Sequence, residues 1–164
     1  MRKTGFTFPP GAVRPCRLTA QAILAFACLL LIGAPRADSL IDLDGLRGRV
    51  IYLDFWASWC APCRQSFPWM QEMKDTYEQQ GLTVIAVNVD RDRKDAERFL
   101  ADFRPSFELQ FDSKGDTAEH FKVQGMPTSL VIDRHGAVRF THIGFRPVDR
   151  ALFESQLREL LAEK

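Results

Sequence analysis

Residues Val50–Arg64 read Val-Ile-Tyr-Leu-Asp-Phe-Trp-Ala-Ser-Trp-Cys-Ala-Pro-Cys-Arg. This stretch carries the strongest structural signal in the chain. The stretch begins as a run of branched and aromatic side chains, which is typical of a buried strand. It ends in a Cys-x-x-Cys pair, and the pattern that follows predicts a helix. Pro62 suits the first turn of that helix, where a missing backbone N–H costs no hydrogen bond. The sequence therefore predicts a strand, a turn and two cysteines at the start of a helix.

The predicted positions of the two cysteines give them different chemistry. The thiolate is the reactive form of cysteine, and the free N–H groups and positive end of a helix stabilise it. We therefore expect Cys60 to be the more readily ionised thiol and the exposed nucleophile. Cys63, one turn further along, can attack a mixed disulfide on Cys60 and release the product. The pair is typical of thiol–disulfide exchange, a reaction that needs no cofactor beyond the Cys60–Cys63 dithiol itself.

Residues 1–37 differ in composition from the remainder of the chain. They carry basic residues but no Asp or Glu, and an apolar stretch from Leu18 to Ile32 is followed by small residues up to Ala37. This order is typical of a secretory signal peptide, and the apolar stretch is shorter than the about 20 residues of a membrane span. Pro35 departs from the usual cleavage pattern, so an uncleaved membrane anchor stays open as the alternative. We expect 1–37 to be a signal peptide or N-terminal anchor, and 38–164 to be one periplasmic or otherwise extracytoplasmic domain.

The composition of residues 38–164 excludes two classes of protein. Acidic residues outnumber basic ones there, which argues against a nucleic-acid partner. Cys60 and Cys63 are the only cysteines after the leader, whereas a small disulfide scaffold would carry more pairs at wider spacings. The close pair therefore indicates chemistry rather than structural cross-linking.

Helical and strand patterns alternate along this domain and predict an α/β fold. Strands are expected from Val50 and over 82–89, 107–111, 129–133 and 137–143, and helices over 63–80, 92–104, 116–123 and 147–162. Asp116–Glu119 has the pattern of a capping box, and the last helix is predicted to bury Val148, Leu152, Leu157, Leu160 and Leu161. Early alternation favours parallel strands, and the late hairpin adds antiparallel ones. We expect a central mixed β-sheet with helices on both faces.

Two motifs resemble those of the thioredoxin-like superfamily, specifically its exported TlpA/ResA type. Phe55-Trp56-Ala57-Ser58-Trp59-Cys60-Ala61-Pro62-Cys63-Arg64 resembles the active-site signature, and Val123-Gln124-Gly125-Met126-Pro127-Thr128 is similar to the second signature loop. The similarity extends in element order over roughly Asp42 to Leu161. It implies the thioredoxin-like fold, a protein-disulfide oxidoreductase activity and export.

The resemblance also assigns roles around the dithiol. It implies that Cys60 is the nucleophile and Cys63 the resolving cysteine, in keeping with the chemistry inferred above. It implies a cis Pro127 that faces the dithiol, with Met126 offering backbone groups to an extended substrate peptide. Trp59 is expected to lie over the site, and Trp56 in the core beneath it. Ala61 and Pro62, between the cysteines, complete the expected substrate-binding surface.

Asp54 is the other residue to which the resemblance gives a role. A carboxylate in a buried strand is costly unless it is used or paired, although periodicity alone also allows a side chain that points to solvent. Thioredoxins keep a buried acid at this position, which implies that Asp54 accepts the proton of Cys63, through a water. Many TlpA/ResA proteins have a Glu three residues after the second cysteine, where this chain has Ser66. Acid–base work would then fall to Asp54 alone.

The same residues allow functions other than disulfide exchange. Copper delivery through Cys60 and Cys63 is the main alternative, because thiolates suit Cu(I). A zinc site needs four ligands, and His120, His135 and His142 have no ligand spacing, so we expect surface or hairpin histidines and no metal site. A peroxiredoxin would need Thr or Ser where Ala57 stands.

The direction of the reaction is predicted from the two residues between the cysteines. Ala61-Pro62 lacks the His or Tyr of strong oxidants and resembles the reducing members, so we expect a reductase; a disulfide-forming oxidase is the alternative. A reductase outside the cytoplasm implies a transmembrane thiol carrier as electron donor. The family resemblance adds apocytochromes c, hence cytochrome c maturation, or copper-site proteins as clients. We expect a monomer.

Overall fold

The computed structural model describes residues 41 and 43–163, so the predicted leader lies outside the described part of the chain. The strands are β1 (Val50–Trp56), β2 (Leu82–Asn88), β3 (Glu108–Phe111), β4 (Thr128–Ile132) and β5 (Val138–Ile143). The α-helices are α2 (Ala61–Tyr77), α3 (Arg93–Phe103), α4 (Asp116–His120) and α5 (Arg150–Ala162). Short 3-10 turns cover Asp44–Leu46, Glu78–Gln80 and Pro147–Asp149.

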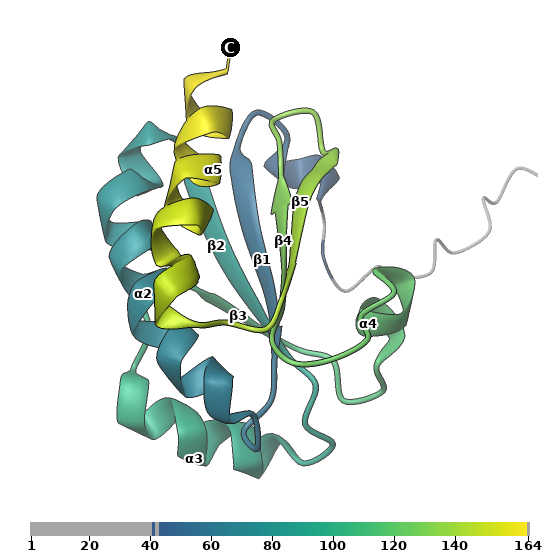
Figure 1. Cartoon of the computed structure of the whole chain (residues 1–164). Helices are drawn as coiled ribbons and strands as arrows, with labels where there is room; N and C mark the ends of the chain where they lie inside the picture. The colour runs from purple at the N-terminus through teal and green to yellow at the C-terminus, as the bar shows by residue number, and fades with distance from the viewer. Residues whose placement is uncertain (1–40, 42, 164) are drawn as a thin grey trace, which may run out of the picture. The chain divides into compact units, whose positions relative to one another are not determined.

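The strands form one mixed sheet in the order β3-β2-β1-β4-β5. β1 pairs in parallel with β2, and β2 with β3, whereas β4 is antiparallel to both β1 and β5. In Figure 1, α2 and α5 cover one face of the sheet and α4 lies on the other. The predicted mixed sheet with helices on both faces is confirmed.

The central strand β1 divides the core into two apolar clusters. All of its residues are buried, and because successive side chains point to opposite faces, alternate residues enter different clusters. Val50, Tyr52 and Trp56 join the cluster that contains α2, α5 and both cysteines of the predicted pair. Ile51, Leu53 and Phe55 join a second cluster, beneath α4. Asp54 therefore faces the layer that contains the cysteines.

Helix α2 begins at the predicted cysteine pair. Cys60 is its N-cap residue with an extended backbone, and a proline occupies the first turn, where it costs no hydrogen bond. Pro68 lies inside the helix. The α-helix ends at Tyr77 and continues as a 3-10 turn to Gln80, which is closed by Gly81 at a φ of 103°. A glycine is favoured there because other residues rarely adopt a positive φ.

Two details of the predicted helices are wrong. The capping box at Asp116 does not form: α4 has Gly115 at its N-cap with no side-chain cap. Instead, Asp112 accepts a 2.9 Å hydrogen bond from the N–H of Ala118 through Oδ2, so the acid at the end of β3 satisfies the helix start. α4 also ends at His120 rather than near Val123.

The buried face of α5 was also predicted incorrectly in part. Leu157 and Leu160 are fully buried, but Val148 and Leu152 are 78% and 56% exposed. Val148 belongs to the 3-10 turn that precedes the helix, so it does not continue the helical spacing. Phe153 takes the buried position in the first turn instead. Within residues 41 and 43–163, none of the helices combines the length and the apolar character needed to cross a membrane.

Candidate active site

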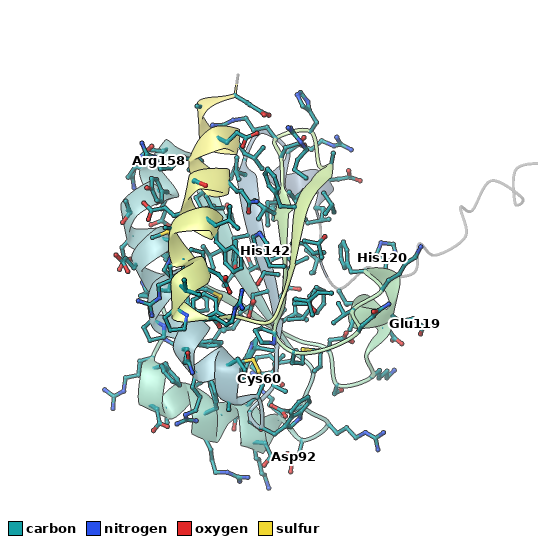
Figure 2. All side chains as sticks on the ribbon, viewed as in Figure 1. Cys60, Asp92, Glu119, His120, His142 and Arg158 are labelled. Atoms are coloured by element: carbon teal, nitrogen blue, oxygen red, sulfur yellow. A yellow bond between two sulfur atoms is a disulfide. The ribbon has the colours of Figure 1, made fainter. Side chains whose placement is uncertain are left out.

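The site is built where β1 ends and α2 begins. Cys60 and Cys63 are joined by a disulfide, with their Cα atoms 5.3 Å apart, and Figure 2 shows Cys60 at this junction. Sγ of Cys60 also accepts a 3.2 Å hydrogen bond from the backbone N–H of Cys63. The same N–H also donates to the carbonyl of Cys60 at 3.2 Å. The sulfur therefore occupies the position in which a first-turn N–H and the positive end of a helix stabilise negative charge.

The sulfur atoms are less accessible than the sequence suggested. Cys60 is only 3% exposed and Cys63 is fully buried, so the prediction of an exposed Cys60 is wrong for the disulfide form. The reason is packing: both cysteines belong to the apolar cluster that contains Trp56 and Phe67. The groups exposed to solvent beside the disulfide are Trp59, at 70%, with Ala61 and Pro62.

A hydrogen-bond network fixes the turn that precedes Cys60. Asp90, just after β2, accepts from the backbone N–H of Ser58 at 2.8 Å and from its hydroxyl at 3.0 Å. Asn88 donates to the same carboxylate at 2.8 Å, and its side-chain oxygen accepts the N–H of Asp90. Val89 N–H bonds to the carbonyl of Trp56. The sequence analysis did not predict this network, whose one signal is an Asn at the last position of an apolar strand with an Asp two residues later.

The second signature loop lies at the same end of the sheet. The Met126–Pro127 peptide bond is cis, as the resemblance implied. Pro127 is buried and Met126 half-buried, and the carbonyl of Pro127 accepts the N–H of Gly144 at 2.8 Å. The next residue, Thr128, pairs with Phe55 near the end of β1. The loop leads into β4 and the disulfide follows β1, and these two strands are neighbours in the sheet.

Asp54 is fully buried in the middle of the sheet. Its Oδ1 accepts a 2.6 Å hydrogen bond from the hydroxyl of Ser129, whereas no group in the described part of the chain donates to Oδ2. Burial raises the pKa of Asp54 to about 7, although the hydrogen bond from Ser129 opposes the rise. The alternative of a solvent-facing Asp54 is wrong, and a carboxyl that titrates near neutral pH can exchange a proton there.

Ser66 and His142 lie in the core. Ser66 is fully buried and donates to the carbonyl of Cys63 at 3.1 Å, so a small hydroxyl occupies this position beside the resolving end of the pair. His142 was predicted to be a surface or hairpin residue; it is a hairpin residue on β5 but only 8% exposed. Its ring stacks on Phe153 at 3.6 Å, and Nε2 contacts Oε1 of Gln156 at 2.7 Å. Packing against α5 therefore removes His142 from the surface.

The arrangement offers few ligands for a metal ion. Among residues 41 and 43–163, no three His, Cys, Asp or Glu side chains come close enough together to hold one. The sulfur atoms of Cys60 and Cys63 are the soft ligands of the site, and they are bonded to each other. The chemistry that the geometry supports directly is the opening and closing of this disulfide.

Comparison with known proteins gives the family. The chain matches the Redoxin family model over residues 18–161 and belongs to that family. It is 31% identical over 116 residues to the thiol-disulfide oxidoreductase ResA of Geobacillus thermodenitrificans, covering 66% of this chain and 67% of that protein. The ResA protein of Bacillus subtilis is 30% identical over 98 residues, or 60% of this chain and 55% of that protein. The chain thus spans between about half and two thirds of the length of these relatives.

A solved structure narrows the class further. A crystal structure from Chlorobium tepidum, described as a thiol:disulfide interchange protein DsbE, is 50% identical, with a TM-score of 0.72 over 73% of this chain and 85% of that one. With the disulfide at the start of α2, these similarities define a thioredoxin-like protein of the TlpA/ResA type. The protein is a protein-disulfide oxidoreductase.

Proposed function

We propose that this protein reduces disulfides of protein substrates outside the cytoplasm, with Cys60 as the attacking and Cys63 as the resolving cysteine. The observation that carries the proposal is the hydrogen bond from Cys63 N–H to Cys60 Sγ at the first turn of α2. This N–H and the positive helix end favour the thiolate of Cys60 once the disulfide is reduced. Cys63 lies deeper in the core, so the disulfide within its reach is the mixed disulfide already formed on Cys60, not a free substrate disulfide.

The reaction follows from these positions. The Cys60 thiolate attacks one sulfur of a substrate disulfide, forming a mixed disulfide and releasing the other substrate sulfur as a thiolate. Cys63 loses its proton and attacks Sγ of Cys60, which breaks the mixed disulfide and releases the second substrate thiolate. Two electrons pass to the substrate, and the enzyme is left with the Cys60–Cys63 disulfide. A thiol donor must then reduce that disulfide for the next cycle.

Asp54 is proposed as the proton acceptor for Cys63. The carboxyl faces the side of β1 that packs against α2, where Cys63 lies. Its pKa of about 7 leaves part of the population ionised at neutral pH, as a general base requires. A bridging water would carry the proton between the two groups.

The surface beside the disulfide is proposed to bind an extended substrate segment. Trp59, Ala61 and Pro62 supply exposed apolar area on one side. Met126 and Pro127 lie in the loop that precedes β4, where the backbone of Met126 would form hydrogen bonds with the substrate segment. Such backbone pairing tolerates different side chains, which suits an enzyme that acts on several protein clients.

The direction, site of action and partners form the remaining part of the proposal. Ala61-Pro62 between the cysteines favours a reducing potential. The basic and apolar leader of residues 1–37 favours export, with or without retention as a membrane anchor. Work in an oxidising compartment requires a transmembrane thiol carrier as electron donor. Apocytochromes c and copper-site proteins are the client classes proposed.

A turnover assay with cysteine variants tests the proposal. With dithiothreitol as donor, the wild-type protein should reduce insulin disulfides, and Cys60→Ser should not. When pre-reduced and mixed with insulin without dithiothreitol, Cys63→Ser should accumulate a mixed disulfide that is visible on a non-reducing gel. Continued turnover by either variant would contradict the mechanism. Formation of disulfides in a reduced client in place of insulin reduction would favour the oxidase, and Cu(I) binding without either reaction would favour copper delivery.

A further inference from the structure

Three side chains on one face of the sheet lie in a single row across adjacent strands. Asp54 on β1 is directly opposite Ser129 on β4, and Ser129 is directly opposite His142 on β5. On the other side of Asp54 the paired residue of β2 is Ala86. Directly paired residues point to the same face with Cβ atoms about 5 Å apart. The row therefore places one hydroxyl, that of Ser129, between the buried carboxyl and the buried imidazole.

The two carboxyl oxygens of Asp54 have different hydrogen-bond environments. Ser129 is 2% exposed, and its hydroxyl donates to Oδ1 at 2.6 Å. Oδ2 is buried and, within the part of the chain that the structure describes, receives no hydrogen bond. A fully buried polar atom without a partner is uncommon and calls for an explanation. Asp54 thus has one anchored oxygen and one oxygen available for a proton.

We infer that Ser129 is the positioning residue for Asp54, holding Oδ1 so that Oδ2 is the atom that accepts the proton of Cys63. The inference rests on the proposed role of Asp54 in the resolving step. Ser129 itself does not exchange the proton with Cys63, because its hydroxyl hydrogen is engaged with Oδ1. Its effect is on the orientation of the carboxyl and on the pH at which that carboxyl is ionised.

The pKa of Asp54 depends on the hydrogen bond from Ser129. Burial raises the pKa of Asp54, and the hydrogen bond from Ser129 is what opposes the rise. A hydroxyl that donates to a carboxylate stabilises its charged form, so loss of the hydroxyl raises the pKa further. At neutral pH a smaller fraction of Asp54 would then be ionised and able to accept a proton. The resolving step should slow accordingly.

The other titratable groups on this face are few. They are Tyr52 on β1, the two cysteines at the start of α2, Tyr77 further along α2, and His142 on β5. The residues of β2 and β4 on this face and the buried residues of α3 and α5 include none. Burial and the Asp54 charge raise the pKa of Tyr52, so it stays protonated, and burial lowers the pKa of His142, so it is neutral near pH 7. Neither Tyr52 nor His142 therefore accounts for a titration near pH 7, and an inflection that Asp54→Asn removes is assigned to Asp54.

The pH dependence of the resolving step tests the inference on the full-length protein. Reduced protein is mixed with a saturating disulfide peptide, and formation of the Cys60–Cys63 disulfide is followed by tryptophan fluorescence from pH 5 to 9. The wild-type rate should rise through an inflection near 7. Ser129→Ala should move that inflection upward and slow the step at pH 7 about threefold to tenfold. Ser129→Thr, which keeps a hydroxyl, should restore the wild-type profile, and His142→Gln should leave the inflection in place.

The variants separate failure of the inference from failure of the proposed function. If Asp54→Asn removes the inflection but Ser129→Ala leaves it unmoved, or if Ser129→Thr behaves like Ser129→Ala, Ser129 does not position the acid. If Asp54→Asn keeps the wild-type profile, the proton role of Asp54 fails, and the inference fails with it. Absence of disulfide exchange by the wild type would instead overturn the proposed function itself. A purely structural role for Ser129 would lower the unfolding temperature without moving the inflection.

Discussion

Asp90 holds Ser58 by two hydrogen bonds, accepting the backbone N–H at 2.8 Å and the hydroxyl at 3.0 Å. Ser58 is two residues before Cys60, so the end of β2 fixes the turn that presents the nucleophile. The carboxylate is 5% exposed and is held in turn by Asn88. The turn before Cys60 is therefore held in place by hydrogen bonds from Asp90, just after β2; we call this contact the Asp90 brace.

Removal of this brace should loosen the turn. Asp90→Ala leaves the part-buried N–H of Ser58 and the buried amide of Asn88 without this acceptor, so we expect a loss of about 1–3 kcal/mol in the free energy of unfolding, with slower insulin reduction. Ser58→Ala removes only the hydroxyl contact and should cost about 0.5–1.5 kcal/mol. Urea unfolding measures both values. The exposed Asp75→Ala serves as the control, and equal stability of Asp90→Ala and this control would show that the brace contributes nothing.

Asp54 should make the oxidised protein less stable as the pH rises. Its pKa is about 7 in the folded protein and near 3.8 when unperturbed, so between these values the folded state binds a proton that the unfolded state has lost. The contribution is therefore most favourable below about pH 4 and is lost as the pH rises to about 7. Asp54→Asn should raise the free energy of unfolding at pH 8 by a few kcal/mol, at most about 4 kcal/mol. A variant whose stability matches wild type at both pH 4 and pH 8 would contradict the raised pKa.

His142 should have the opposite pH dependence. Burial lowers its pKa below the usual 6.5, so the unfolded chain takes up a proton that the folded protein excludes. Stability from this residue is complete above pH 6.5 and falls as the pH drops below it. His142→Gln should flatten the acid side of a plot of unfolding temperature against pH, with the exposed His135→Gln as a control. An acid limb identical in all three proteins would exclude the prediction.

The element order and the cysteine pair were predictable because their signals are local. A run such as Val50–Trp56 has the composition of a buried strand, and a Cys-Ala-Pro-Cys that precedes a helical pattern fixes the start of α2. The loop containing Pro127 was located by its resemblance to a family motif. Such signals need no knowledge of which residues meet in space.

Much of the remaining site depends on contacts between distant residues. Asp54 and Ser129 are 75 positions apart, and Ser58 and Asp90 are 32 apart, so neither pairing is visible before the strands are placed in register. Burial of His142 depends on Phe153 of α5, and the exposure of Val148 depends on where that helix begins. These features follow from the sheet order and the packing of α5, which periodicity along the chain does not specify.

Exposure of Trp59 allows its role in substrate binding to be tested separately from the reaction. Trp59→Ala removes exposed apolar area and no core packing, so it should leave the free energy of unfolding within about 0.5 kcal/mol of wild type. If Trp59 contacts the client, the KM for a disulfide peptide should rise several-fold, while the rate with a small disulfide such as cystine stays near the wild-type value. The same KM for the peptide in both proteins would remove Trp59 from the binding surface.

The reduction potential of the Cys60–Cys63 pair tests the proposed direction of the reaction most directly. The protein is equilibrated with glutathione at defined ratios of its reduced and oxidised forms, and the fraction of free Cys60 and Cys63 is quantified by alkylation and mass spectrometry. A reductase should have a potential near or below roughly −270 mV, the value of thioredoxin. A potential near roughly −120 mV, that of a strong disulfide-forming oxidant, would contradict the account.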